Sequence, residues 1–161
     1  MQQCSSKLDR RFMVKIIIGS DHAALSLKNE IKKHLSKLYN IEDMSVPDDA
    51  TNSDYPNIAK LVCDRVANNK DTFGILICGT GIGMSIAANK QVGIRCALCM
   101  DEYSAKMSRQ HNDANILALG QRTIGSGLAI SIVDAYLNEN FSNESRHINR
   151  LQLIDKNYQP K

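Results

Sequence analysis

Cys78 and the glycine-rich stretch after it form the chemically most suggestive segment of the sequence. Residues 78–83 read Cys-Gly-Thr-Gly-Ile-Gly, between the apolar run 73–78 and a helical pattern. Glycines let the backbone approach a ligand and expose N–H groups to an anion. A thiolate there could remove a proton from carbon next to a carbonyl while the N–H groups stabilise the oxyanion. The segment predicts proton-transfer chemistry; a small buried cysteine in a purely structural turn is the alternative.

Other polar residues could bind or activate the same substrate. Asp21-His22 follow the first apolar run and could polarise a hydroxyl or bind phosphate, although a helix cap with an exposed histidine is equally consistent. His111 lies beside Asn112 at the end of a predicted helix, where a charged histidine is favoured. Arg146 and Arg150 are four residues apart in a predicted helix, so they could bind a phosphate together or form a solvated face.

Motifs for a cofactor or a metal are incomplete. A dinucleotide fingerprint requires G-x-G-x-x-G, whereas the spacing after Cys78 is G-x-G-x-G, and the acidic residue expected about 20 residues on is missing. Cys96 and Cys99 form a C-x-x-C, but no second pair completes a zinc site. The run 93–100 around them is predicted to be a strand, in which residues three apart point to opposite faces. We expect no cofactor and no metal; a redox pair is the alternative.

The composition excludes several classes of protein. The 161 residues carry a net charge of +3, and the basic residues are scattered, which argues against nucleic-acid binding. No apolar run is long enough to span a membrane, and residues 1–13 lack the apolar region of a secretory signal. The odd number of cysteines, five, suggests free thiols in a reducing compartment. We therefore expect a cytoplasmic protein with no nucleic-acid or membrane partner.

Strand and helix patterns alternate along the chain and must position these residues. Strands are predicted at 13–19, 41–46, 73–78, 93–100 and 115–119, and helices at 24–38, 54–66, 84–90, 101–110, 125–140 and in the tail from 143. The alternation predicts a parallel sheet covered by helices on both faces, with ligands bound beyond the carboxyl ends of the strands. We expect a single domain over residues 14–161 after a short arm, residues 1–13.

Together these segments resemble the ribose-5-phosphate isomerase type B family, which also includes galactose-6-phosphate and allose-6-phosphate isomerases. The resemblance spans about residues 14–154, in order and with few gaps. Its stretches are IGSDHA (18–23), DYP (54–56), GILICGTGIGMSIAANK (74–90), GIRCALC (93–99), RQHNDANILALGQR (109–122) and RHINR (146–150). It implies an α/β fold: a three-layer α/β/α sandwich with a Rossmann-like five-stranded parallel sheet and a C-terminal helix, acting without metal or nucleotide.

Carried over by position, the resemblance assigns a role to each candidate residue. Cys78 resembles the base that moves a proton between C1 and C2, and the loop 79–83 resembles the anion hole for the enediolate. Thr80 and His111 resemble residues that assist ring opening, and Asp21 resembles a contact to the ring oxygen or hydroxyls. The resemblance implies substrate or phosphate contacts for His22, Gly79, Gly81, Gly83, Asn112, Arg122, Arg146 and Arg150.

The implied activity is the interconversion of ribose 5-phosphate and ribulose 5-phosphate in the non-oxidative pentose phosphate pathway. The implied assembly is a homodimer or a dimer of dimers whose sites draw residues from two subunits. A hexose-6-phosphate isomerase of the allose or galactose type is one alternative. A non-catalytic sugar-phosphate sensor is another, although a sensor has no need of Cys78, Thr80 and His111. One departure from the family, Asn143-Glu144-Ser145 where two glycines are usual, is expected to reshape the turn before Arg146.

Overall fold

The computed structural model describes residues 13–49, 51–67 and 69–157. The arm expected at residues 1–13 therefore lies, except for Met13, outside the described residues. Within the described part, five parallel strands form one sheet in the order β2-β1-β3-β5-β4. The strands are β1 (Lys15–Ser20), β2 (Asn40–Asp43), β3 (Thr72–Cys78), β4 (Cys96–Leu98) and β5 (Ile116–Gly120). The predicted five-stranded parallel sheet is confirmed.

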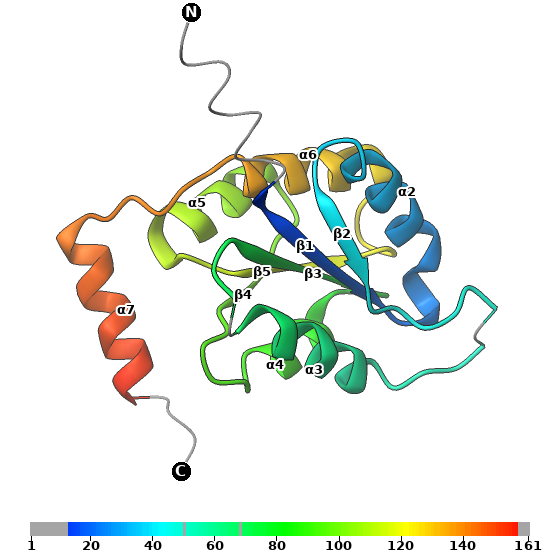
Figure 1. Ribbon diagram of the computed structural model, residues 1–161, viewed down its shortest axis with the longest axis horizontal. Helices are drawn as coiled ribbons and strands as arrows, with labels where there is room; N and C mark the ends of the chain where they lie inside the picture. The colour runs from blue at the N-terminus through cyan, green and yellow to red at the C-terminus, as the bar shows by residue number, and fades with distance from the viewer. Residues whose placement is uncertain (1–12, 50, 68, 158–161) are drawn as a thin grey trace, which may run out of the picture.

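Helices cover both faces of the sheet, which gives the predicted three layers (Figure 1). One face carries α2 (Leu25–Leu35), α5 (Glu102–Asn112) and α6 (Ser126–Leu137), and the other carries α3 (Tyr55–Val66) and α4 (Ile82–Ala88). A single turn of 3-10 helix, η1 (His22–Ala24), leads into α2. The C-terminal helix α7 (Ser145–Asn157) packs against α5 at the margin of the sandwich.

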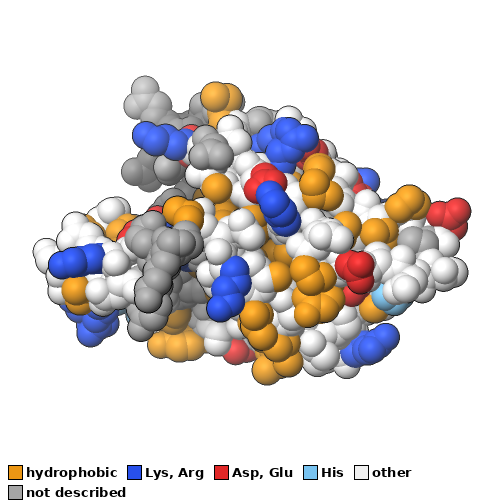
Figure 2. Space-filling model, turned by 90° about the horizontal axis from the view of Figure 1, so that it is seen from below, with side chains coloured by type: hydrophobic (Ala, Val, Ile, Leu, Met, Phe, Trp, Pro, Cys, Tyr) orange, Lys and Arg blue, Asp and Glu red, His pale blue; other side chains and the backbone are white. Residues whose placement is uncertain are grey.

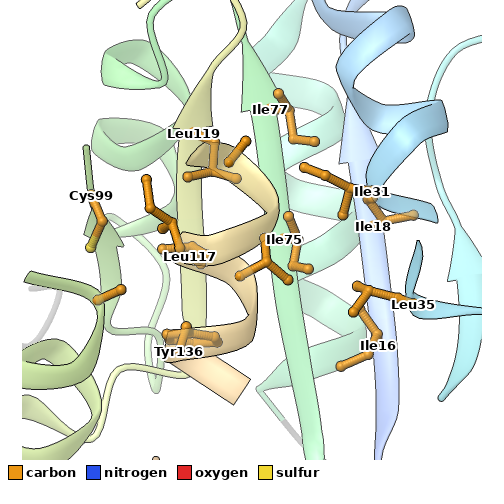
Figure 3. Close-up of a cluster of buried hydrophobic side chains, with 14 of the residues drawn as sticks. Ile16, Ile18, Ile31, Leu35, Ile75, Ile77, Cys99, Leu117, Leu119 and Tyr136 are labelled. Carbon is orange, nitrogen blue, oxygen red and sulfur yellow. The ribbon is translucent and has the colours of Figure 1, made fainter. Parts of the chain in front are cut away.

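The apolar runs are continuous because both faces of the sheet are buried. Ile16 and Ile18 point into the layer of α2 and α6, as Figure 3 shows, whereas Ile17 points toward α3. Cys99 belongs to the first layer and Cys96 packs against the second, so the two sulfurs lie on opposite sides, as predicted.

The strand predicted over 93–100 is shorter than expected. β4 is an edge strand of three residues, and Gly93, with φ 77°, is outside the extended region. The side-chain amide of Asn89 takes the place of a neighbouring strand: it accepts a hydrogen bond from the Cys96 N–H and donates one to the Cys96 carbonyl. This side-chain pairing ends the sheet at β4.

The turn before α7 contains the residues at which the sequence departs from the family that it resembles. Asn143 has φ 56°, in the left-handed region that favours glycine and that asparagine also tolerates. The asparagine can thus hold a left-handed turn without a glycine. The carboxylate of Glu144 accepts a hydrogen bond from Nε of Arg146 at 2.8 Å, so the departure also supplies a negative charge beside that guanidinium.

Candidate active site

The carboxyl ends of β1, β3 and β5 meet at one edge of the sheet, here called the carboxyl edge. The N–H of Asp21 donates to the carbonyl of Ile77, one residue before Cys78. The N–H groups of Gln121 and Arg122 donate to the carbonyls of Cys78 and Gly79, both at 2.9 Å. Backbone hydrogen bonds therefore bring three strand ends, and the polar residues that follow them, side by side.

Cys78 ends β3 with its side chain at this edge and 6% of its surface exposed. The N–H of Gly81 points at its sulfur, with 3.1 Å between N and Sγ. Gly81 has φ 78°, and a Cβ there would lie 2.6 Å from the Leu98 side chain, so this close turn requires glycine. The sulfur thus lies against a backbone donor at the mouth of the loop 79–83, the geometry needed to hold negative charge.

Arg122 adds a positive charge to the same loop. A Cβ built on Gly79 would lie 3.3 Å from Nη1 of Arg122, so the guanidinium rests directly on this glycine. Thr80 is exposed beside it, and its Oγ1 accepts a hydrogen bond from the N–H of Ile82. Arg122 and the loop N–H groups together could bind an anion.

Tyr55 contacts the loop from another element, and sequence reasoning missed it. A Cβ on Gly83 would lie 2.6 to 2.9 Å from the ring and hydroxyl of Tyr55, so the ring rests on this glycine at the start of α3. The Asp-Tyr-Pro stretch indicates a helix start and is part of the family resemblance, but it gave Tyr55 no role of its own.

Asp21 and His22 complete the group at the carboxyl edge. Asp21 caps η1, because its Oδ1 accepts a hydrogen bond from the Ala23 N–H at 3.0 Å, as the alternative interpretation expected. His22 is exposed, and both its backbone N–H and its Nδ1 lie 3.1 Å from Oγ of Ser53. The histidine ring is therefore held by the loop that precedes α3.

The remaining predicted residues form a second group at the opposite, amino edge. His111 and Asn112 end α5, where Nε of Arg95 donates to the Asn112 carbonyl. The nearby Asn115 carbonyl accepts from Gly74, four residues before Cys78 in β3. A strand rises about 3.3 Å per residue, so roughly 13 Å of sheet lies between the two edges. A single chain does not bring His111 to Cys78.

His147, which was not among the predicted site residues, belongs to the second group. Its ring stacks on that of His111 with centroids 4.3 Å apart and planes 9° from parallel. It is 2% exposed, and its buried Nε2 has no hydrogen-bond partner within the described residues. Burial, together with the neighbouring His111, lowers the pKa of His147.

Arg146 and Arg150 are exposed on the same helix as His147. Asn112 lines a cavity of about 510 Å³ between α7 and the segment 89–97. No residue of the carboxyl-edge group lines this cavity, so it is separate from Cys78.

The other described thiols, Cys63, Cys96 and Cys99, have no features of a metal centre or a redox pair. Within the described ranges no three His, Cys, Asp or Glu side chains are placed to share a metal ion. Burial raises the pKa of Cys63 to about 12 and that of Cys99 to about 11, and it also raises that of Cys96. The same ranges contain no helix of the length and apolarity that crossing a membrane requires.

Comparison with known proteins gives consistent matches. The family model described as Ribose/Galactose Isomerase matches residues 16–154. Ribose-5-phosphate isomerase B of Escherichia coli is 46% identical over 146 residues, 88% of this chain and 95% of that protein. D-erythrulose-4-phosphate isomerase of Pectobacterium atrosepticum is 45% identical over 130 residues, 80% of this chain and 86% of that protein. The structure of ribose-5-phosphate isomerase B of Mycoplasma genitalium with bound ribulose 5-phosphate has a TM-score of 0.85 and 42% identity, covering 90% and 96% of the two chains.

Proposed function

The chain belongs to the ribose/galactose isomerase family, and we propose that within it the protein interconverts ribose 5-phosphate and ribulose 5-phosphate in the pentose phosphate pathway. The main structural support for this proposal is the position of the Cys78 sulfur. It lies 3.1 Å from the Gly81 nitrogen, at the start of a glycine-rich loop. This arrangement places a base beside donors for the oxyanion that aldose–ketose isomerisation generates.

In this mechanism the thiolate of Cys78 removes the proton on C2 of the open-chain aldose and returns it to C1. The electron pair of that C–H bond forms the enediolate, and a second proton passes from the oxygen on C2 to the oxygen on C1. Positioned proton transfer typically contributes ~10²–10⁴-fold in rate. Each oxyanion donor adds ~10²–10³-fold. Asp21 and Thr80, at the same edge, would assist on the substrate hydroxyls, and His22 and Arg122 would bind the phosphate.

A homodimer would complete this site, since His111, Asn112, Arg146 and Arg150 lie at the other edge of their own chain. We propose that a second copy supplies them, in a dimer or a dimer of dimers. Hydrophobic side chains lie exposed on the face formed by α3 and α4, seen in Figure 2, where a second copy could bury them. The exposed apolar residues of α3, α4 and the segment from β4 into α5 include Tyr55, Ile82, Ile86, Leu98, Met100 and Tyr103.

The free thiols support a location in the cytoplasm. Cys63, Cys78, Cys96 and Cys99 are unpaired, as expected of a protein kept in a reducing compartment.

A four-carbon sugar phosphate is the second candidate substrate, because a relative named for D-erythrulose 4-phosphate is almost as similar as the one from Escherichia coli. The carboxyl-edge group requires only a phosphate and a hydroxyl next to a carbonyl, and a tetrulose phosphate has both. The preference would then depend on how far the phosphate-binding side chains lie from Cys78.

The test is an isomerase assay on purified, chelator-treated protein. Ketose formation from ribose 5-phosphate is followed beside reactions with D-erythrulose 4-phosphate, allose 6-phosphate and galactose 6-phosphate. Fast conversion of ribose 5-phosphate by the chelator-treated protein would support both the proposed activity and its independence of metal ions. If the protein converts only one of the other sugar phosphates, the proposed mechanism stands and that sugar phosphate becomes the proposed substrate. Binding of these sugars without conversion of any of them would favour the sensor alternative.

A further inference from the structure

Ser53 contacts His22 at two places, although the two residues are 31 positions apart in the sequence. We propose that Ser53 is a positioning residue that holds the His22 ring in the tautomer with hydrogen on Nε2, so that this N–H points at a bound phosphate. The identity of the ligand rests on the proposed function, whereas the tautomer does not.

The direction of the two hydrogen bonds follows from which atoms carry hydrogen. The backbone N–H of His22 can only donate, so Oγ of Ser53 accepts this bond at 3.1 Å. The ring Nδ1 lies at the same distance from the same oxygen. Across the described residues Nδ1 is the only acceptor found for the Ser53 hydroxyl hydrogen. When the hydroxyl donates to Nδ1, the neutral ring must carry its hydrogen on Nε2.

Ser53 is fixed because of where it lies on the chain. It directly precedes Asp54, the N-cap residue of α3. This helix packs so closely on β1 that a Cβ on Gly19 would lie 2.7 Å from the Val62 side chain. The distance between Ser53 and the turn after β1 is therefore set by two rigid elements.

Two other contacts hold the loop between β2 and α3, one against the end of β1 and one against α2. Oγ of Ser45 accepts a hydrogen bond from the Ser20 N–H at 2.9 Å. Further along, the buried ammonium of Lys28 lies 3.2 Å from the carboxylate of Asp48. Contacts at Ser45, Asp48 and Ser53 thus fix this loop at three points. Ser53 is therefore already in place to orient His22 before a ligand binds.

The tautomer decides whether the outer nitrogen of the ring presents a hydrogen-bond donor or a lone pair to a ligand. A phosphate monoester carries between one and two negative charges at neutral pH and accepts hydrogen bonds only through oxygen. With hydrogen on Nε2 the neutral ring offers a donor, whereas the other tautomer would offer a lone pair and repel the phosphate. Arg122 supplies positive charge at this edge, and the His22 ring in this tautomer would add a directed hydrogen-bond donor.

The first experiment is two-bond ¹H–¹⁵N NMR of the histidine rings in the ligand-free full chain at about pH 8, where an ordinary imidazole is neutral. The His22 signals are assigned from their loss in His22→Gln. We expect Nε2 to be the protonated nitrogen in the wild type and in Ser53→Thr, and a mixture of tautomers in Ser53→Ala. A wild-type ring protonated on Nδ1, or a Ser53→Ala spectrum like that of the wild type, would overturn the proposal.

The second experiment measures the effect on binding. Loss of one neutral hydrogen bond should raise KM for ribose 5-phosphate about 2- to 10-fold in Ser53→Ala and leave kcat within about twofold. Thr51→Ala, which removes an exposed hydroxyl from the same loop, should change neither, and Ser53→Thr should restore KM. If Ser53→Ala alters the His22 tautomer but leaves KM unchanged, the His22 N–H does not point at the bound phosphate. If the chain isomerises no sugar phosphate, Kd for inorganic phosphate replaces KM as the readout, so failure of the proposed function leaves this proposal testable.

Discussion

At the residue scale, the surroundings of Cys78 distinguish it from the other described cysteines. Cys63 and Cys99 lie inside apolar layers, where burial raises their pKa, and no N–H of a glycine loop points at them. Cys78 ends its strand beside the Gly81 N–H, at the edge that also carries Asp21, His22 and Arg122. Position at a strand end, rather than residue type, makes this thiol the candidate base.

Replacement of the candidate base is the direct test at this scale. Cys78→Ala should lower kcat for ribose 5-phosphate by about 10²–10⁴-fold, because proton transfer loses its base, and should leave KM within a few-fold. Steady-state kinetics measures both values. Cys96→Ala is the matched control and should retain wild-type rates. Near-wild-type turnover of Cys78→Ala would rule out the assignment.

At the scale of elements, the two loops that follow β3 and β5 touch each other. Gly120 lies so close to the first loop that a Cβ on it would be 2.6 Å from the backbone carbonyl of Thr80 and 2.5 Å from Oγ1 of Thr123. The backbone of Thr80 cannot move away from an added Cβ as easily as the end of a flexible side chain can. The position of the anion loop therefore depends on a glycine outside it.

Gly120→Ala should displace Thr80 and the loop N–H groups, and a shift of about 1 Å can cost about 10²-fold in rate. We expect a loss of kcat with the circular dichroism spectrum unchanged. Gly127→Ala provides the control, because a Cβ at that position of α6 meets no atom within 4 Å. Equal activity of the two variants would contradict the close approach of the loops.

The contact between α2 and β2 depends on ion pairs. Burial works against the charge of Asp43, but hydrogen bonds from Lys32 and Ser45 and the nearby Lys28 ammonium outweigh it and lower the pKa of this carboxyl to about 2. Lys28 itself is buried, with its ammonium 3.3 Å from Asp43. These ion pairs hold β2 and the loop that follows it against α2.

The lowered pKa predicts how stability depends on pH. A carboxyl whose pKa falls on folding stabilises the protein above its unfolded pKa, near 4, and this contribution is lost as the pH falls toward about 2. Asp43→Asn should lower the free energy of unfolding at neutral pH by about 2 kcal/mol or more, since the variant also leaves a buried lysine with one partner fewer. Urea unfolding at fixed protein concentration measures this difference, which should shrink from about pH 4 downward. A constant difference across that range would contradict the role of the ionised carboxylate.

At the scale of the whole molecule, the candidate residues are divided between the two edges of the sheet. α5 starts at the carboxyl edge after β4 and runs back toward the amino edge, which places His111 and Asn112 at its far end. α7 then packs against α5 and keeps Arg146, His147 and Arg150 with them. If the proposed site needs both groups, each site must span two chains.

Mixed dimers test this division directly. Cys78→Ala and His111→Asn should each be nearly inactive alone, yet a heterodimer purified through two different tags should recover about half of the wild-type activity, because one of its two sites combines an intact Cys78 with an intact His111. A dimer of two differently tagged Cys78→Ala chains is the control and should stay inactive. No recovery in the heterodimer would show that the two groups act in separate sites or in one chain.

The sequence by itself determined the α/β class, the five strands and the residues that follow their carboxyl ends. These features depend on local rules, since apolar runs, helical periodicity and glycine turns are visible within a few residues. Its resemblance to a family also implied His111, Arg146 and Arg150 as site residues, but gave no location for them. The length of β4 was misjudged because Gly93, with φ 77°, leaves the extended region and because this strand lies at the edge of the sheet.

Only the tertiary structure decided which residues of the candidate site contact one another. Tyr55 rests on Gly83, Ser53 holds His22, and His147 stacks on His111, and each contact joins segments that are distant in the sequence. The two edges are kept apart by the length of the strands and by the direction in which α5 crosses the sheet. Such contacts depend on the packing of rigid elements against one another, which no local pattern of residues encodes.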